Sequence, residues 1–359
     1  MKYLIFNPFG IGDVLFSTPM IAAIKAHDSE AHIGYLCNRR ALQVLETNPD
    51  IDELFVFEKD EFRAAFRRSV FDGVAKVAHL LKSIRRHRFE MVFDLALSRQ
   101  YNFFLFLLGI RTRSGLDYRK RGQFLTHRVP IEGYDNQSIA EYYLDTLRAV
   151  GIQAHKQSTH LTLTASDKQV VQTFFKESGV LAENTIAIVP GGGVSFGKDK
   201  INFRRWDIEQ YVALAERLIQ EENSSILVVC APDEQDLVQA FEALNNDKII
   251  IAPQTTVRES AAFMKACRLV VANDGGPMHL ATAVDAAVVA IFGPTDEQVY
   301  GPYTTSSRVK CVTHDIACRP CYKRFRLADC DHRNCLGHLP LEKVYQSVRD
   351  VLSQPCGVN

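Results

Sequence analysis

Short apolar segments alternate with amphipathic helical patterns along almost the whole chain, and this alternation is what most constrains the fold. The segments typical of buried strands are residues 3–6, 32–37, 54–57, 91–95, 185–189, 226–230, 249–251, 269–272 and 287–292. Helical patterns lie between most of them, most clearly at residues 208–220, 234–243 and 258–267. Strands separated by helices pair in parallel, with helices on both faces of the sheet, so the sequence predicts a doubly wound α/β fold.

A polar stretch from residue 151 to residue 168 interrupts this series, which starts again after it. A chain of 359 residues is long enough for two domains of about 150 residues or more. We therefore expect two Rossmann-like domains, residues 1–165 and 166–359, facing a central cleft. The second domain would end with a cysteine-rich segment, residues 311–335, and a C-terminal helix.

Composition indicates a globular protein outside the membrane core, with 47% hydrophobic and 23% charged residues. No apolar run approaches the roughly 20 residues of a membrane span, since residues 103–110 form a run of only eight. Polar residues at 7–13 break the first apolar run too early for a signal peptide. The expected compartment is the cytoplasm.

Charge is balanced over the whole chain but not along it. Residues 63–128 contain 15 Lys and Arg against four Asp and Glu, although the formal net charge of the chain is zero. The tightest clusters are residues 85–88 and 119–121. Such asymmetry favours a face that meets an anion, for which nucleic acid, an anionic membrane and a phosphorylated acceptor are the candidates. A basic face that is only solvated is the alternative.

The segment from Asn273 to Ala281 combines a carboxylate, Asp274, with the glycines Gly275 and Gly276 and a helix expected to open at Pro277. The first N–H groups of a helix have no intrahelical partner and attract anions, and glycines allow a phosphate to approach the backbone. Asp before two glycines is also ordinary turn chemistry. The segment predicts an anion site, with a simple turn as the alternative.

A second glycine turn opens the chain. Residues 1–6 read as a strand, followed by Gly10, Gly12 and Asp13 and then by one apolar helix from Val14 to about Lys25. The dinucleotide fingerprint requires a third glycine where Leu15 stands, so the pattern argues against an NAD site. Asp13 could also be the N-cap of the helix.

Polar residues directly follow four strands of the second half, which predicts one shared pocket beyond the carboxyl ends of those strands. They are residues 190–193, 231–234, 273–276 and 293–296. Residues 192–199 also match a phosphate-binding loop except at the last position, where Asp199 replaces the magnesium-binding hydroxyl. Because the next helical pattern begins only near Trp206, a kinase or NTPase loop is disfavoured.

Several motifs together resemble the bacterial heptosyltransferases, glycosyltransferase family 9. In the first half they are GDVL at 12–15, TP at 18–19, FDL at 93–95, RSG at 113–115 and THRVP at 126–130. In the second half they are PGG at 190–192, RRW at 204–206, PDE at 232–234, NDGGPMHLA at 273–281 and FGPTD at 292–296. The resemblance covers residues 1 to about 340. It implies the two-domain GT-B fold and heptose transfer from ADP-heptose to the lipopolysaccharide core.

The resemblance also implies site residues. Asp13 matches the general base, and a carboxylate at a helix N-terminus stays ionised, as a proton acceptor must. Arg204 stands where the family usually has a Lys that meets the diphosphate. Glu234 resembles the carboxylate that holds the ribose or base of the donor. The remaining donor-binding candidates are Gly191, Gly192, Asp274, Gly275, Gly276 and His279.

Each of these assignments has an alternative without a function. Arg204, Arg205 and Trp206 could simply open a helix, and His279 could be a histidine satisfied within the core. Asp94 is interpreted only as a cap of the following helix.

The first domain would bind the acceptor, an anionic glycolipid at the inner face of the bacterial inner membrane, with only peripheral membrane contact. Gly12, Arg119, Lys120 and Arg121 are the candidates for acceptor or phosphate binding. No nucleic acid is expected, and no cofactor is required. Neither D-x-D sequence, at 50–52 or 329–331, follows an apolar strand, so no metal is expected at the donor.

Two other functions remain open. One is transfer of another nucleotide sugar in O-antigen, capsule or protein glycosylation. The other is a non-catalytic protein that binds nucleotides or polyanions.

Four of the nine cysteines form a spaced group, Cys318, Cys321, Cys330 and Cys335. Two close pairs separated by a short spacer could hold a structural zinc ion, and a reducing cytoplasm disfavours disulfides. The spacing between the pairs is shorter than is usual for zinc ribbons. Free thiols or a redox-labile loop are the alternative.

Overall fold

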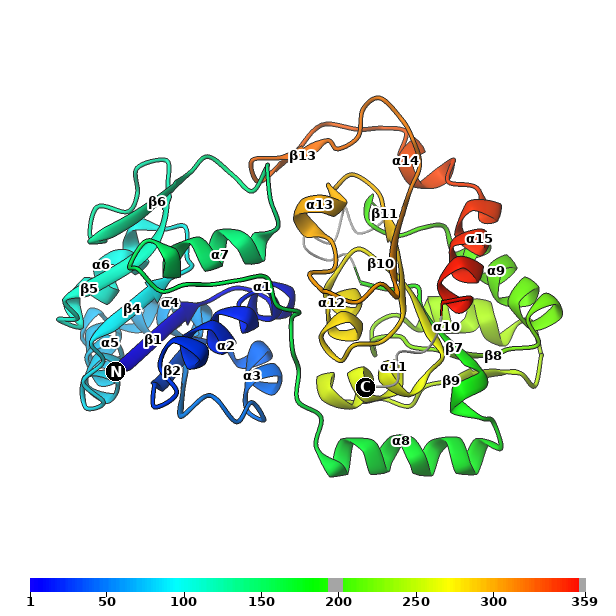
Figure 1. The fold of residues 1–359 in the computed structure, drawn as a ribbon, viewed down its shortest axis with the longest axis horizontal. Helices are drawn as coiled ribbons and strands as arrows, with labels where there is room; N and C mark the ends of the chain where they lie inside the picture. Colours follow the sequence, from blue (N-terminus) through cyan, green and yellow to red (C-terminus); the bar gives the residue numbers. More distant parts are fainter. Residues whose placement is uncertain (193–202, 355–359) are drawn as a thin grey trace. The chain divides into compact units, whose positions relative to one another are not determined.

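The computed structural model describes residues 1–192 and 203–354, which divide into two compact units, Met1–Thr159 and His160–Asn359 (Figure 1). The division falls a few residues before the boundary expected from the sequence. Each unit contains one six-stranded parallel sheet with helices on both faces, so the predicted α/β class is confirmed.

Unit 1 has the strand order β3-β2-β1-β4-β5-β6 of a doubly wound nucleotide-binding sheet. The strands are β1 (Lys2–Asn7), β2 (His32–Cys37), β3 (Glu53–Val56), β4 (Met91–Asp94), β5 (Thr112–Tyr118) and β6 (His127–Ile131). All of their pairings are parallel. Strands β5 and β6 were not predicted, because charged side chains and Pro130 interrupt their apolar pattern.

Helices α4, α5 and α6 bury apolar side chains against one face of this sheet, and α2 and α7 pack together on the other (Figure 1). The helices of unit 1 are α1 (Ile11–Phe16), α2 (Thr18–His27), α3 (Arg39–Leu45), α4 (Lys59–Arg68), α5 (Val70–Arg85), α6 (Arg99–Leu107) and α7 (Ile139–Arg148).

The single helix expected from Val14 to Lys25 is in fact two, α1 and α2, which separate at Ser17. Pro19 stands in the first turn of α2 and has no N–H to continue the hydrogen-bond ladder of α1. Ser17 Oγ donates to the Val14 carbonyl and shares a hydrogen bond with the Tyr35 hydroxyl, each 2.6 Å long. The break is therefore built into the core.

Unit 2 repeats the doubly wound order as β12-β11-β10-β7-β8-β9. Its strands are β7 (Thr185–Val189), β8 (Ser225–Val228), β9 (Ile249–Ile251), β10 (Leu269–Asn273), β11 (Val288–Phe292) and β12 (Val309–Thr313). The three central strands β7, β10 and β11 are buried along their whole length, as expected where helices cover both faces. The edge strand β12 was not predicted.

Helices α9, α10 and α15 cover one face of the unit 2 sheet, while α8, α11 and α12 lie on the other. The helices are α8 (Ala165–Ser178), α9 (Ile208–Glu221), α10 (Gln235–Glu242), α11 (Val257–Ala266), α12 (Gly276–Ala283), α13 (Glu297–Tyr300), α14 (Asn334–Gly337) and α15 (Leu341–Leu352). A short 3-10 turn (Ala182–Asn184) precedes β7, and a small hairpin joins β13 (Tyr322–Lys323) to β14 (Arg326–Leu327).

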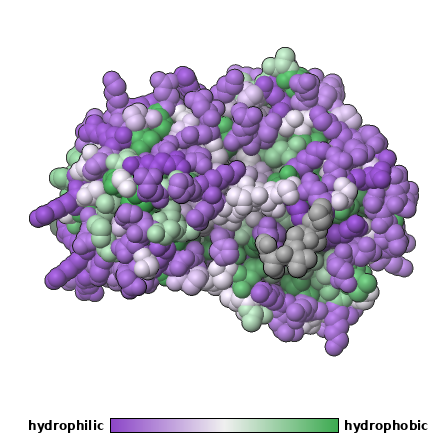
Figure 2. Space-filling model, in the orientation of Figure 1, coloured by the Kyte–Doolittle hydropathy of each residue, from purple (hydrophilic) through white to green (hydrophobic). Residues whose placement is uncertain are grey.

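No helix within residues 1–192 and 203–354 is both long enough and apolar enough to cross a bilayer. The face drawn in Figure 2 is mostly hydrophilic, with apolar residues gathered in small separate areas. The possible phosphate-binding loop at 192–199 lies, apart from Gly192, outside the described residues.

Candidate functional site

Four segments meet at the carboxyl edge of the unit 2 sheet because the strands they follow run parallel. Residues 190–192 follow β7, residues 229–234 follow β8, residues 274–276 follow β10, and residues 293–296 follow β11. This is the edge at which doubly wound sheets bind ligands. The fold thus brings together the segments that the sequence singled out.

Asn273, the last residue of β10, organises this edge. Its Nδ2 donates to the carbonyl oxygens of Pro190 and Gly191, at 2.8 and 3.3 Å. Its Oδ1 accepts from the backbone N–H of Trp206, at 3.0 Å. The side chain is buried, and it joins three segments far apart in sequence. The sequence alone does not indicate this role, although Asn273 begins the NDGGPMHLA motif.

Trp206 is a core residue rather than the first residue of a helix. It lies before α9, whose N-cap is Asp207, and its indole N–H donates to the Leu339 carbonyl at 3.3 Å. Its ring packs edge-on against Tyr211 at 5.1 Å. This packing fixes the backbone that carries Arg204 and Arg205, and the helix itself begins two residues after this tripeptide, at Ile208.

Arg204 and Asp274 form a buried ion pair. Arg204 Nε and Nη2 lie 2.9 and 2.5 Å from Asp274 Oδ2, and the Thr295 hydroxyl donates to the same oxygen at 2.5 Å. Asp274 is completely buried, and its Oδ1 has no hydrogen-bond partner among residues 1–192 and 203–354. Buried polar atoms nearly always have a partner, so this oxygen is a candidate to bind a ligand hydroxyl. Thr295 was not identified from sequence as a site residue.

Helix α12 begins directly after this carboxylate. Gly275 is its N-cap and provides no side-chain cap, and a Cβ built on Gly276 would meet no atom within 4 Å. The N–H groups of the first turn have no helical acceptor and carry the positive end of the helix dipole. Gly276 leaves room for an anion to approach them.

His279 lies in the second turn of α12 and is buried. Burial lowers the pKa of His279 to about 4; the Asp274 carboxylate opposes this shift, and the Arg204 guanidinium adds to it. The imidazole is therefore neutral near pH 7, and it can offer a hydrogen bond but not a positive charge.

Glu234 holds the glycine turn after β7. Its Oε1 accepts from the Gly192 N–H at 2.8 Å and from Arg205, and its Oε2 accepts from the Ala231 N–H at 2.9 Å. A Cβ on Gly191 would lie 2.0 Å from Glu234 Oε2, and Gly192 has a φ of +88°. Both positions therefore require glycine.

Arg205 completes this arrangement by donating from Nε to the Gly192 carbonyl at 2.7 Å. The sequence indicates no role for Arg205 beyond its place in the RRW motif. Both oxygens of Glu234 accept hydrogen bonds from the protein itself, so the carboxylate shapes the turn.

Asp13 lies in unit 1 as the third residue of α1, half-buried, with Gly10 as the N-cap. The interpretation of Asp13 as the N-cap is therefore wrong. The Asn7 amide fixes this turn, since its Nδ2 donates to the Asp13 carbonyl at 3.0 Å and its Oδ1 accepts from the Phe9 N–H at 3.2 Å. Gly12 precedes Asp13 in the same helical turn. The Asp13 carboxylate is thus carried by a fixed backbone at the carboxyl edge of the sheet.

Asp94 ends β4 beside β1 and is fully buried. It accepts hydrogen bonds from the Ala96 N–H at 3.0 Å and from the Asn102 side chain. Burial raises the pKa of Asp94 to about 7, although both hydrogen bonds favour the charged form. The N-cap of α6 is Ser98, so the interpretation of Asp94 as a helix cap is wrong.

The basic triplet Arg119, Lys120 and Arg121 is exposed in the loop after β5. Arg119 and Lys120 have φ values of +51° and +59°, and the guanidinium groups of Arg119 and Arg121 lie 5.2 and 5.3 Å from the Tyr118 ring centroid. Stacking of this kind holds two cations at the carboxyl edge of the unit 1 sheet.

The four spaced cysteines are free thiols, with Cys335 buried and Cys318 exposed. Within the described part of the chain, no three of their sulfur atoms lie within 4.8 Å of one another. A structural zinc ion at these thiols, considered from the sequence, therefore stays a prediction.

Two Rossmann-like domains, each with a glycine turn and a carboxylate at its strand ends, are the architecture of GT-B glycosyltransferases. The sequence pattern of glycosyltransferase family 9 (heptosyltransferase) matches residues 77–331. The chain belongs to this family, and the resemblance noted in its motifs is confirmed.

Relatives with assigned activities have low sequence identity to this chain, but the similarity extends over most of its length. Lipopolysaccharide heptosyltransferase 3 of Escherichia coli is 23% identical over 82% of this chain and 84% of its own length. Lipooligosaccharide heptosyltransferase 2 of Campylobacter jejuni is 22% identical over 99% of this chain and 100% of its own.

Solved structures share the fold over nearly the full chain. A glycosyltransferase family 9 protein from Veillonella parvula has a TM-score of 0.80 at 20% identity, covering 98% of this chain and 97% of its own. The ADP-heptose heptosyltransferase II of E. coli has a TM-score of 0.74 at 19% identity, covering 98% of both. E. coli heptosyltransferase WaaC with ADP-2-deoxy-2-fluoro heptose has a TM-score of 0.72 at 16% identity, covering 98% of this chain and 99% of its own.

Proposed function

We propose that this glycosyltransferase moves a heptose, with inversion, from ADP-heptose to a lipopolysaccharide core acceptor. The family, the names of its relatives and a structural neighbour solved with ADP-2-deoxy-2-fluoro heptose support this donor. The observation that carries the proposal is the Asp274 carboxylate, which lies directly before the first turn of α12. Its Oδ2 is held by Arg204 and Thr295, and its buried Oδ1 has no partner among the described residues.

Unit 2 has the donor role. The first N–H groups of α12 and the Gly275–Gly276 backbone receive the diphosphate, and Asp274 Oδ1 accepts a hydrogen bond from a donor hydroxyl. Arg204 balances the Asp274 charge, so that the carboxylate does not repel the anionic donor. Gly191 and Gly192, shaped by Glu234, form the wall beside them, and His279 contributes a neutral hydrogen-bonding group.

Unit 1 has the acceptor role. The acceptor oxygen attacks the anomeric carbon, the bond from that carbon to the diphosphate oxygen breaks, and Asp13 takes the hydroxyl proton. The departing diphosphate gains negative charge, which the α12 N-terminus stabilises. Arg119, Lys120 and Arg121 bind a phosphate of the glycolipid. No step requires a metal ion at the donor.

The surface of α4 and α5 provides the membrane contact. Phe71 is 87% exposed and Val70 is 69% exposed, with Phe66 and Val74 also exposed near them. Residues 59–88 contain nine Lys and Arg against three Asp and Glu. Exposed apolar side chains within a basic segment suit an anionic lipid surface, where the rings enter the headgroup region and the cations meet lipid phosphates.

Calorimetric titration with ADP, UDP, GDP and ADP-heptose tests the proposal. We expect ADP to bind best among the diphosphates and ADP-heptose to bind more tightly than ADP. Preference for UDP or GDP would assign another nucleotide sugar, and no binding would favour a non-catalytic protein.

Gly276→Ala is the matched site variant, because its new methyl group meets no protein atom within the described ranges. Loss of ADP affinity there without loss of stability would support a nucleotide at this turn.

A further inference from the structure

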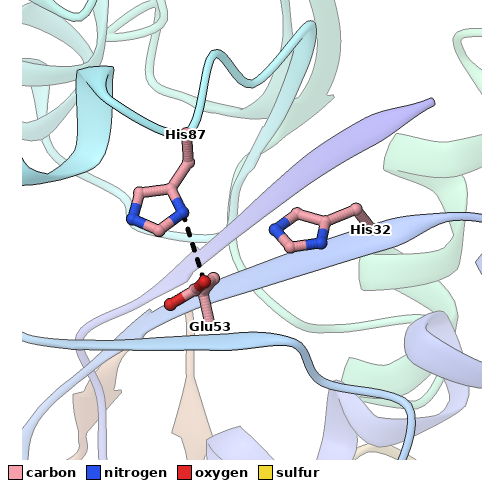
Figure 3. A group of neighbouring side chains, drawn as sticks. All are labelled: His32, Glu53 and His87. Atoms are coloured by element: carbon pink, nitrogen blue, oxygen red, sulfur yellow. Dashed lines mark ion pairs between the residues drawn. The ribbon is translucent and has the colours of Figure 1, made fainter.

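Three metal-ligating side chains converge at the amino edge of the unit 1 sheet, away from the strand ends that carry Asp13 and Asp94 (Figure 3). They are His32, the first residue of β2, Glu53, the first residue of β3, and His87, between α5 and β4. One ligand atom from each lies within 4.8 Å of the other two. The His87 Nδ1 to Glu53 Oε1 distance is 3.3 Å.

The fold fixes these side chains from three separate segments. Parallel pairing of β2 with β3 places His32 near Glu53, and a turn after α5, with Arg88 at a φ of +55°, brings in His87. Phe89 stacks on both imidazoles, with centroid distances of 6.2 Å to His32 and 5.9 Å to His87. The rings are therefore oriented before any ligand arrives.

The Asp52 carboxylate lies beside the His32 ring. Its Oδ1 lies 3.6 Å from His32 Nδ1, and its Oδ2 accepts from the Ile33 N–H at 2.7 Å. His32 Nε2 is buried and has no hydrogen-bond partner among residues 1–192 and 203–354. A carboxylate beside Nδ1 favours the tautomer with the proton there, which leaves the Nε2 lone pair available, as in many carboxylate–histidine–metal arrangements.

We propose that His32, Glu53 and His87 bind a divalent transition metal ion of the zinc class. Ligands at about 2.1 Å in a tetrahedron are about 3.4 Å apart, so the His87–Glu53 spacing already fits. The His32 ligand atom lies within 4.8 Å of the other two. Two imidazoles and one carboxylate suit zinc and leave a fourth position for water. The ion links β2, β3 and the segment after α5.

Calorimetry with ZnCl2 on the metal-stripped, tag-free full chain tests this site. Because thiols also bind zinc, every titration uses a Cys318→Ser, Cys321→Ser, Cys330→Ser, Cys335→Ser background. We expect one equivalent to bind, with affinity at least tenfold weaker in His32→Ala, Glu53→Gln and His87→Ala. His79→Ala, which changes an exposed histidine of α5, is the matched control and should bind normally.

A thermal melt with and without zinc provides a second readout, since an ion that binds only the folded state raises the melting temperature. The rise should occur in the background protein and in His79→Ala but not in Glu53→Gln. Circular dichroism verifies that each variant is folded. Failure of the four-serine background to bind zinc, or equal binding by Glu53→Gln and His79→Ala, would overturn the proposal while leaving the transferase proposal untouched.

Discussion

Arg204 and Asp274 meet at the carboxyl edge of the unit 2 sheet as a buried ion pair in which both guanidinium hydrogen bonds reach the same oxygen, Oδ2. Seventy residues separate them in sequence. The pair leaves the other oxygen, Oδ1, pointing to no partner within the described ranges, directly before the first turn of α12. A carboxylate that is charge-balanced on one side and open on the other suits an anionic donor with hydroxyl groups.

Breaking this pair should destabilise unit 2. Arg204→Ala leaves the buried Asp274 carboxylate without its counter-ion, which we expect to cost about 3–5 kcal/mol of unfolding free energy. Trp206 is the only tryptophan of the chain and is buried in unit 2, so its fluorescence in urea reports this unit. Arg349→Ala removes a more exposed pair with Glu222 and should cost less than about 1 kcal/mol. Equal effects of the two variants would contradict the importance of the buried pair.

His279 should make unit 2 less stable in acid. Its pKa is lowered to about 4 in the folded protein by burial, whereas the unfolded chain has a value near 6.5. Between these values only the unfolded state takes up the proton. The contribution of neutral His279 to the free energy of unfolding is therefore fully present above about pH 6.5 and is lost as pH falls toward 4. The loss should reach about 3 kcal/mol.

The measurement is Trp206 fluorescence in urea at pH 4.5 and 7, on the wild type and on His279→Gln. His279→Gln should not show this loss of unfolding free energy between pH 7 and 4.5. An equal loss in the wild type and the variant would count against a neutral buried imidazole.

Asp94 should have the opposite effect in unit 1. Burial raises the folded pKa of Asp94 to about 7, above its unfolded value near 3.9, so the folded state retains a proton that the unfolded state loses. The contribution of protonated Asp94 to the free energy of unfolding is therefore fully present below about pH 4. It decreases by about 4 kcal/mol as pH rises to about 7. Asp94→Asn removes this dependence.

Asn102 Oδ1 is buried and has no hydrogen-bond partner in the described structure. If the Asn102 amide flips, this oxygen can accept a hydrogen bond from the amide that Asp94→Asn introduces. Hydrogen exchange of β1 and β4 at pH 5 and 8 provides the measurement. A variant whose protection falls with pH as steeply as that of the wild type would refute the assignment.

Asp13→Asn should separate catalysis from donor binding. A general base typically contributes about 10²–10⁴-fold to the rate, so kcat should fall by that factor while ADP affinity stays within about twofold. Transfer to a soluble core oligosaccharide and ADP calorimetry measure the two quantities. Asp60→Asn, at an exposed carboxylate of the same unit, is the control and should retain full activity. Equal losses of transfer and of ADP binding would remove Asp13 as the base.

The α4–α5 surface should govern binding to anionic membranes. Replacing Val70 and Phe71 by Ser removes the most exposed apolar groups, each worth about 1.5–3 kcal/mol when buried, and should weaken vesicle binding by tenfold or more. Co-sedimentation with phosphatidylglycerol vesicles measures this, with phosphatidylcholine vesicles as the uncharged comparison. Leu181→Ser changes a residue that is 64% exposed in unit 2 and should bind like the wild type. Equal binding by both variants would exclude this surface.

Much of the architecture follows from local sequence alone. The predicted strands at 32–37, 185–189 and 249–251 have the observed bounds, because continuous apolar runs flanked by polar turns are typical of buried parallel strands. Strands β5, β6 and β12 lack such runs. Charges within β5 and β12 and Pro130 in β6 conceal their period, and only pairing with a neighbouring strand makes them part of the sheet.

The sequence by itself determined the fold class, the family and the segments that carry the candidate site, since strand periodicity, glycine turns and motif order are local properties. The tertiary structure decided which groups meet. The Asn273 side chain bonds to the backbone of Pro190 and Trp206, Arg205 pairs with Glu234, Thr295 pairs with Asp274, and His32 lies near Glu53 and His87. Most of these partners come from different strand–helix units. Their distances depend on how parallel strands align at the edges of a sheet, and no local pattern encodes that alignment.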